Sequence, residues 1–220
     1  MNKYKHKLAA VGLARWYYQV ESNYGTLRGW IRHTLASGEY LFGRHSLWVG
    51  EPTTSVQRLV FVCLGNINRS AFGAEVAQSL GLNAVSIGLS TSTGAPATPQ
   101  AQAQALRQGF ELHCHRATNI SDFAAEPEDL FLVMELRHAC ELVARGISAD
   151  AIRLLGYWAS PARLHLHDPH TLSDAYFSTC FTLIESAVRN LGARLSASVK
   201  MAAAPQLYNS EVASASLSQL

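Results

Sequence analysis

The sequence has few cysteines and no closely spaced pair of them. Its four cysteines are Cys63, Cys114, Cys140 and Cys180, and none belongs to a C-x-x-C motif. Without that motif a structural zinc knuckle is not expected, and four cysteines are few for a secreted disulfide scaffold. We therefore expect a cytoplasmic protein in which a reactive thiol stays reduced, and we interpret Cys114, Cys140 and Cys180 as core residues.

Long hydrophobic runs are also missing, and charge is sparse. No apolar run approaches the roughly 20 residues of a membrane span, and residues 8–13 are too few and too mixed for the core of a signal peptide. Charged residues make up 15% of the chain and the net charge is +2, which argues against a nucleic-acid-binding protein that relies on phosphate contacts. The hydrophobic content of 48% over 220 residues instead predicts a folded domain with a substantial core.

The two ends of the chain differ from its middle. Residues 1–57 hold seven Lys/Arg and three Asp/Glu and are rich in aromatics. Apolar residues with helical spacing at 13–20 and 27–35 predict two amphipathic helices separated by Gly25 and Thr26. This basic, aromatic-rich extension is expected to pack on the main domain or on another subunit, and attachment to a membrane surface is a weaker alternative. Residues 196–220, rich in Ala and Ser, are expected to be a mobile tail.

Strand and helix patterns alternate through residues 58–195. Apolar runs predict strands at 59–62, 84–87, 130–134 and 152–155, and helices are predicted at 71–80, from Thr98 to Gly109, at 135–145 and from about 173 to 195. This alternation indicates an α/β fold, a parallel sheet with helices on both faces. Ligands in such sheets lie beyond the carboxyl ends of the strands, and the segment after residue 62 lies at such an end.

That segment combines a thiol and a guanidinium in one short loop. It reads Cys63-Leu64-Gly65-Asn66-Ile67-Asn68-Arg69-Ser70. Loop amides, the start of the following helix and the Arg69 charge all favour a thiolate and a bound phosphate-sized anion. Gly65 permits unusual backbone torsions, Asn66 can brace the loop, and Ser70 can donate a hydrogen bond to the sulfur as it departs. The alternative is that Cys63 is a small buried hydrophobic residue.

A thiolate mechanism also needs a proton donor for the leaving group. Asp168 is the candidate, because Pro169 stiffens the loop in which it lies, although Asp-Pro can equally be an ordinary turn. His165, His167 and His170 surround it. We interpret this stretch as a His-rich mobile loop rather than a metal site, since no second set of ligands with clear spacing supports a metal.

Residues 58–195 resemble the low-molecular-weight protein tyrosine phosphatase family. The family's loop C-x-G-N-I-C-R-S matches residues 63–70, and its late Asp-Pro matches Asp168-Pro169. Further matching segments, in order, are residues 86–88, 109–112, 115–117, 129–135 and 154–156. The resemblance implies a three-layer fold around a four-stranded parallel sheet, and hydrolysis of phosphotyrosine through a cysteinyl-phosphate without a metal or other cofactor.

The same resemblance implies a role for individual residues. Cys63 is the expected nucleophile, Arg69 the phosphate-binding residue and Asp168 the acid and then the base. Expected substrate contacts are Leu64, Gly65, Asn66, Ile67, Asn68, Ser70, Leu89 and His170, and expected supports of the loop are Ser86 and His115. The expected partner is a phosphotyrosine protein, with a bacterial tyrosine autokinase of polysaccharide export as the suggested setting.

The chain departs from the family pattern at several positions. Asn68 replaces a second cysteine that can shelter the nucleophile as a disulfide, so oxidation here is expected to proceed further. Ala71 replaces a proline, and His170 replaces a tyrosine that flanks the substrate ring. Ile67 stands where members acting on phosphoarginine tend to have threonine, which favours aryl phosphates. Two other functions stay open at this point: arsenate reduction on the same fold, and a silent phosphate-binding adaptor.

Overall fold

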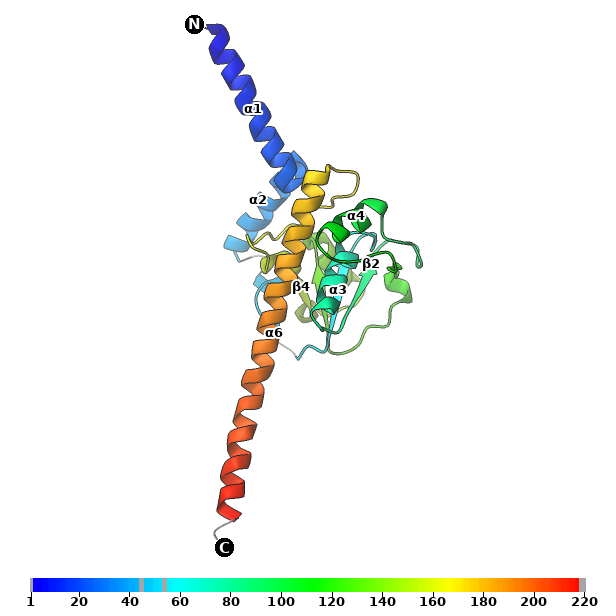
Figure 1. The fold of residues 1–220 in the computed structure, drawn as a ribbon, viewed down its shortest axis with the longest axis vertical. Helices are drawn as coiled ribbons and strands as arrows, with labels where there is room; N and C mark the ends of the chain where they lie inside the picture. Colours follow the sequence, from blue (N-terminus) through cyan, green and yellow to red (C-terminus); the bar gives the residue numbers. More distant parts are fainter. Residues whose placement is uncertain (1, 44–45, 53–54, 218–220) are drawn as a thin grey trace.

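Four short strands form one parallel sheet in the computed structural model, which describes residues 2–43, 46–52 and 55–217. The strands are β1 (Arg58–Cys63), β2 (Ala84–Gly88), β3 (Asp129–Val133) and β4 (Ile152–Leu154), in the order β2-β1-β3-β4. The helices are α1 (Asn2–Tyr24), α2 (Leu27–Leu41), α3 (Arg69–Ser79), α4 (Pro99–Arg107), α5 (Leu136–Ala144) and α6 (Asp174–Leu217), with short 3-10 turns between them such as η1 (Ser46–Trp48) (Figure 1).

Strand β1 lies in the interior of the sheet, as its apolar run predicts. It pairs with β2 on one side and with β3 on the other, both in parallel. Val60, Phe61 and Val62 are completely buried, because helices cover both faces of the sheet. The chain leaves β1 toward one neighbour and later returns to the other side of it, so the strand order reverses between β1 and β3. In open parallel sheets this switch point is where ligands bind.

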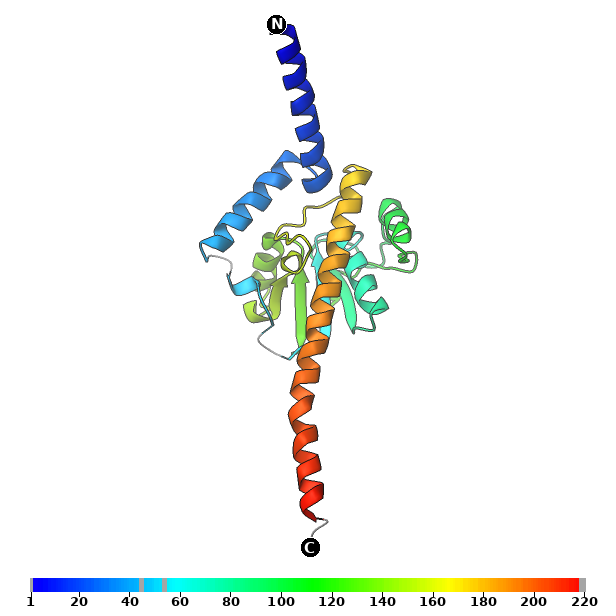
Figure 2. The ribbon, with the colours of Figure 1, turned by 60° about the vertical axis from the view of Figure 1, so that its left-hand side comes forward.

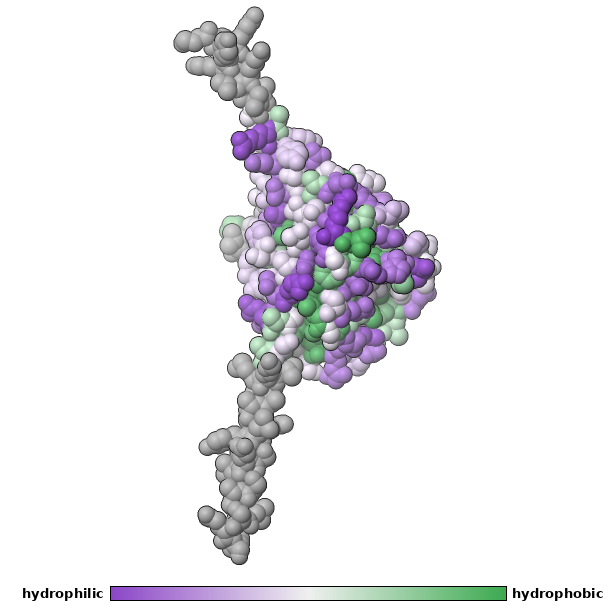
Figure 3. Space-filling model, in the orientation of Figure 1, coloured by the Kyte–Doolittle hydropathy of each residue, from purple (hydrophilic) through white to green (hydrophobic). Residues whose placement is uncertain are grey.

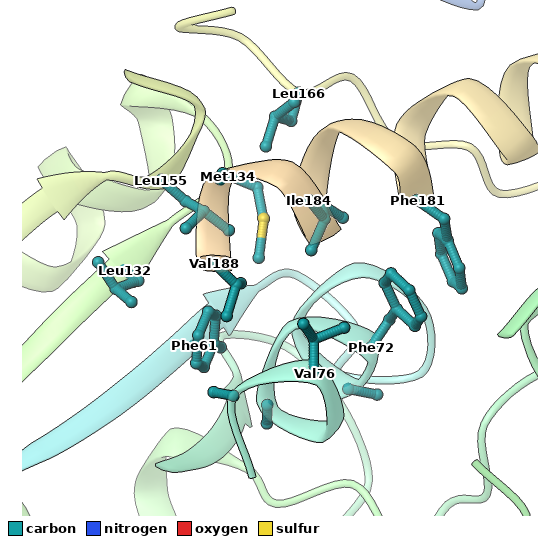
Figure 4. Packing of buried hydrophobic residues seen from close by; sticks show 14 of the residues in the cluster. Phe61, Phe72, Val76, Leu132, Met134, Leu155, Leu166, Phe181, Ile184 and Val188 are labelled. Carbon is teal, nitrogen blue, oxygen red and sulfur yellow. The ribbon is translucent and has the colours of Figure 1, made fainter. Parts of the chain in front are cut away.

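The helices pack on the sheet in two separate hydrophobic cores. One core joins β1, α3, α4 and α6, and the other joins the opposite sheet face to α5 and to residues near η1. In the first core the rings of Phe72 and Phe181 stack with their centroids 4.1 Å apart, which fixes α6 against α3 (Figure 4). These two cores make the three-layer α/β fold that the sequence predicts.

Helix α4 begins where its sequence predicts. Thr98 is the N-cap residue, and its hydroxyl oxygen accepts a hydrogen bond of 3.1 Å from the amide of Ala101. Pro99 occupies the first helical turn, where its missing N–H leaves no intrahelical bond unmade. The Thr98 hydroxyl also donates to Asn68 Oδ1 at 2.6 Å, so the start of α4 is tied to the loop after β1.

The N-terminal extension forms the two predicted helices, α1 and α2, separated at Gly25 and Thr26. The corner between them packs against the domain, while the first part of α1 and the last part of α6 project in opposite directions (Figure 2). The predicted end of the last helix near residue 195 is wrong, because α6 continues to Leu217. Alanine, frequent in that segment, is the strongest helix former, and a helix that leaves the domain needs no apolar stripe. The mobility of residues 196–220 stays a prediction.

Two of the predicted core cysteines are on the surface. Cys114 lies in an exposed loop and Cys140 on the outer side of α5, whereas Cys180 is buried as expected.

The face of the domain that α6 crosses is largely hydrophilic, with a patch of hydrophobic residues near its middle (Figure 3). Among the described residues, no helix combines the length and hydropathy that crossing a bilayer requires.

Candidate active site

The loop from Cys63 to Arg69 connects the carboxyl end of β1 to the first residue of α3. Cys63 ends the strand and is only 3% exposed, and Arg69 begins the helix and is 1% exposed. Because β1 lies beside the switch point of the sheet, the loop occupies the edge where the structure can admit a ligand. The first-turn amides of α3 have no carbonyl of their own helix to bond, so they are available to an anion.

The thiol of Cys63 is surrounded by hydrogen-bond donors. The backbone N–H of Asn66 donates to Cys63 Sγ at 3.2 Å, and the Ser70 hydroxyl oxygen lies 3.0 Å from the same sulfur. A thiolate accepts both of these bonds, whereas a thiol competes with Ser70 for the role of donor. Both groups therefore lie within hydrogen-bond distance of the sulfur atom that is expected to act as the nucleophile.

Asn66 holds the loop in shape through every polar group it has. Its Nδ2 donates to the hydroxyls of Ser70 at 2.9 Å and Ser86 at 2.8 Å, and its Oδ1 accepts from the amide of Thr118 at 2.8 Å. Its carbonyl oxygen accepts from Nε2 of His115 at 2.7 Å. Burial lowers the pKa of His115, which keeps the ring neutral although the hydrogen bond to Asn66 opposes that shift. Ser86 and His115 thus lie where loop support was predicted.

The unusual backbone torsion of the loop belongs to Asn66 and not to Gly65. Asn66 has φ of +50°, and Gly65 does not adopt a positive φ. Asparagine tolerates this left-handed conformation better than most residues, and here the hydrogen bonds of its side chain fix it. The sequence suggested the wrong position because glycine is the usual residue for such torsions.

Arg69 is the centre of a buried group of charges. Its Nη1 donates to Glu135 Oε1 at 2.7 Å and to the carbonyl oxygen of Leu166 at 2.8 Å. Its Nη2 forms an ion pair with Asp168 Oδ2 at 2.9 Å. Its Nε has no hydrogen-bond partner among the described residues, although it is buried. A buried N–H without a partner costs free energy, so this group is suited to a bound oxyanion.

Glu135 is the site residue that sequence reasoning missed. Burial would raise the pKa of its carboxyl, but the charge of Arg69, supported by their hydrogen bond, holds the pKa well below its usual range. Burial alone would lower the pKa of Arg69, and the charges of Asp168 and Glu135 more than reverse this and raise it. The only signal in the sequence was an acidic residue directly after the buried strand at 130–134, and nothing there pointed to Arg69.

Two buried histidines flank Glu135. Burial lowers the pKa of His138 to about 3, with the charge of Arg69 acting in the same direction. Burial also lowers the pKa of His165 to about 4, although Glu135 opposes the shift. His165 is therefore a buried neutral residue next to Glu135, and not part of an exposed loop. In the part of the chain that the structure describes, no three His, Cys, Asp or Glu side chains are grouped to hold a metal ion.

These histidines predict that stability falls in mild acid. Their unfolded pKa is near 6.5 and their folded pKa is lower, so the stability they contribute is present above about pH 6.5 and is lost as pH falls toward 4. Each contributes up to about 1.4 kcal/mol per pH unit in that window. We expect His138→Gln to reduce the difference in unfolding free energy between about pH 7.5 and about pH 5 by roughly 2 kcal/mol.

Urea unfolding at the two pH values measures this difference. His113→Gln is the matched control, because the His113 side chain is 65% exposed. An equal pH difference in His138→Gln and His113→Gln would show that the buried ring does not resist protonation.

The remaining predicted substrate contacts divide into two groups. Leu64 and His170 are exposed at the rim of the site and Ile67 is half-buried, so all three can meet a substrate. Leu89 cannot, because it packs in the core with Val62, and its predicted contact with substrate is wrong. It follows β2 on the same side of the sheet as the buried Ile87, an orientation that the sequence did not reveal.

Asn68 and Asp168 complete the site. The side chain of Asn68 is buried and turned toward Thr98, so only its backbone can face a ligand. Asp168 is partly exposed, with its side chain 31% accessible, and its Oδ1 accepts a hydrogen bond of 3.2 Å from the amide of His170. The structure thus brings Asp168 to the loop that holds Cys63 and Arg69, although Asp168 follows Arg69 by 99 positions in the sequence.

Sequence comparisons with known proteins point to one family. Residues 58–201 match the family model described as low molecular weight phosphotyrosine protein phosphatase. The low molecular weight protein-tyrosine-phosphatase Wzb of Escherichia coli strain K12 is 31% identical over 144 residues, which are 63% of this chain and 95% of the relative.

Solved structures of tyrosine phosphatases are also similar to this chain. The crystal structure of the Erwinia amylovora tyrosine phosphatase AmsI is similar with a TM-score of 0.59 and 26% identity, over 67% of this chain and 99% of that one. The tyrosine phosphatase Wzb from Escherichia coli K30, solved in complex with sulphate, is similar with a TM-score of 0.56 and 28% identity, over 64% of this chain and 99% of that one.

Proposed function

Because residues 58–201 match its family model, the chain belongs to the low molecular weight phosphotyrosine protein phosphatase family, and we propose that Cys63, Arg69 and Asp168 carry out its reaction. The chain is a protein tyrosine phosphatase, a cysteine-dependent hydrolase. The observation that supports these roles most directly is the contact between Asp168 and Arg69 in the same site as the buried Cys63 thiol.

In the first step the Cys63 thiolate attacks the phosphorus atom of phosphotyrosine. The S–P bond forms as the bond from phosphorus to the phenolic oxygen breaks, and Asp168 gives its proton to that oxygen. The loop amides and the free N–H of Arg69 hold the equatorial oxygens, where the negative charge of the transition state resides. The products of this step are a cysteinyl-phosphate and a tyrosine hydroxyl.

In the second step water replaces sulfur on phosphorus. Asp168, now a carboxylate, takes a proton from the water as its oxygen forms the new P–O bond. The S–P bond breaks and its electron pair returns to Cys63. The hydroxyl of Ser70, 3.0 Å from the sulfur, donates a hydrogen bond that stabilises the departing thiolate. Inorganic phosphate then leaves.

The acid role of Asp168 is tested by the leaving group. Asp168→Asn cannot supply the proton, so kcat/KM for phenyl phosphate is expected to fall about 10²-fold or more. The same variant should change kcat/KM for 2,4-dinitrophenyl phosphate by less than about threefold, because dinitrophenolate leaves without protonation. Stopped assays with both esters measure the two values. An equal loss with both esters would mean that Asp168 is not the acid.

We also propose the compartment in which the enzyme works and the protein on which it acts. A free catalytic thiol needs a reducing compartment, which supports the cytoplasm. The family resemblance supports a bacterial tyrosine autokinase of polysaccharide export as the partner, and such a kinase should lose phosphotyrosine with wild-type enzyme and keep it with Cys63→Ser. Membrane-surface contact through residues 1–57 stays a weaker proposal. No observation favours arsenate reduction or a silent adaptor.

A further inference from the structure

The segment that carries Asp168 is fastened to the domain on its inner side. The amide of Leu166 donates to the carbonyl of Met134, at the end of β3, at 3.0 Å. The carbonyl of His167 accepts from the Tyr176 hydroxyl of α6 at 3.0 Å. These bonds fix the backbone up to the residue before Asp168, but they leave the outer side of the segment to other contacts.

The outer side of this segment is covered by the N-terminal extension. We call residues 23–29, where α1 passes into α2, the corner. Arg163 Nη1 donates to the carbonyl of Asn23, and the Arg163 guanidinium carbon lies 4.2 Å from the centroid of the Tyr24 ring. Nε2 of His167 lies 3.4 Å from the hydroxyl of Thr26, which caps α2. In Figure 2 the blue α2 lies beside the yellow segment before α6.

Two glycines let the corner approach closely. A Cβ added at Gly29 would overlap the carbonyl oxygen of Tyr24 and lie 3.1 Å from Cδ2 of the His167 ring. Gly25 has φ of +78°, and a Cβ there would lie 2.7 Å from the Tyr176 ring. The backbone of the corner therefore sits directly against His167, the neighbour of Asp168, and against Tyr176, which binds the His167 carbonyl.

The corner lies outside residues 58–201, the part that matches the family model. We propose that it is a positioning element for the reaction: it clamps the 163–167 segment against the sheet and so holds Asp168 over the leaving group. This inference rests on the acid role of Asp168 proposed above. A misplacement of about 1 Å at a reacting group can cost about 10²-fold in rate. Arg69 donates to the carbonyl of Leu166 in this segment but is also held by Glu135, so loss of the clamp should reduce proton donation by Asp168 more than phosphate binding by Arg69.

Gly29→Ala in the full chain tests the clamp. The new methyl group would overlap the Tyr24 carbonyl oxygen and lie 3.1 Å from His167 Cδ2, so the corner must change its shape where it meets the His167 ring. We therefore expect kcat/KM for phenyl phosphate to fall at least about tenfold. For 2,4-dinitrophenyl phosphate, which needs no proton, the change should stay below about twofold. Gly38→Ala is the matched control in the same helix, because a Cβ at Gly38 meets nothing within 4 Å. It should leave both values unchanged.

A second pair of variants tests whether the corner positions Asp168 if Gly29→Ala does not fold. Tyr24→Leu removes the ring beneath Arg163, and Tyr18→Leu makes the same change at a side chain of α1 that is 63% exposed. Tyr24→Leu should show the leaving-group-dependent loss and Tyr18→Leu should not. The inference is overturned if Gly29→Ala or Tyr24→Leu, when folded, loses activity equally with both esters or not at all.

Asp168→Asn distinguishes the two possible failures. If Asp168→Asn shows the leaving-group-dependent loss and the corner variants do not, the clamp is wrong and the acid assignment stands. If Asp168→Asn shows no such dependence, the acid assignment itself is wrong, and the clamp fails with it.

Discussion

A Cys63→Ser variant is expected to lose turnover of aryl phosphates by on the order of 10⁴-fold or more. Serine fills nearly the same volume, but its hydroxyl stays protonated at neutral pH and needs a base. Among the residues that the structure describes, the only side chain hydrogen-bonded to Cys63 Sγ is that of Ser70, at 3.0 Å, and a hydroxyl cannot act as that base. Steady-state assays under reducing conditions measure the loss.

Two controls make the result specific to the nucleophile. Cys140→Ser, the same change at an exposed thiol on α5, should keep wild-type turnover. Inorganic phosphate should raise the melting temperature of Cys63→Ser as it does that of the wild type, because Arg69 and the loop amides remain. Residual turnover within about tenfold of wild type in Cys63→Ser would contradict covalent catalysis at this residue.

Arg69→Lys is expected to lower kcat/KM by on the order of 10²-fold or more. Lysine keeps the charge but has no planar fork, and one ammonium group cannot reach Glu135, Leu166 and a phosphate at once as the guanidinium can. The change should also reduce the free energy of unfolding by about 1–3 kcal/mol, because the buried Glu135 loses part of its hydrogen bonding. Assays and urea unfolding of the same variant give both quantities.

Arg153→Lys is the matched control for that variant. Arg153 is also buried, and its guanidinium donates to the carbonyls of Asp150, Ile152 and Glu51 away from the candidate site. Its replacement should cost stability and leave kcat/KM unchanged. Wild-type activity in Arg69→Lys would mean that the fork does not bind the transferring phosphoryl group.

The sequence predicts those parts of the fold that depend on neighbouring residues. The apolar run at 59–62 predicts a strand buried on both faces, and Thr98-Pro99 predicts the start of α4, because each signal is local. Only five residues separate the thiol of Cys63 from the guanidinium of Arg69, so the spacing predicts that both face one anion. The apolar run at 152–155 likewise predicts the fourth strand, whereas the link between Asp168 and this loop came from the family resemblance.

Other parts depend on contacts between distant segments, which no local pattern contains. Glu135 meets Arg69 only because β3 ends beside β1, and Leu89 is buried because of the side of the sheet that it faces. The torsion at Asn66 is stabilised by Ser86 and Thr118, which lie on other elements. The contact of the corner with Arg163 joins residues 140 positions apart, so the amphipathic spacing of α1 could predict a helix but not its partner.

In the proposed mechanism the Cys63 sulfur takes the phosphoryl group from the substrate. Acid quenching of the enzyme during turnover of phosphotyrosine, followed by digestion and mass spectrometry, tests it most directly. We expect one added phosphoryl group on the peptide that contains Cys63, and none in Cys63→Ser. Release of phosphate with no phosphoryl group on any peptide, or with the group on another residue, would contradict it.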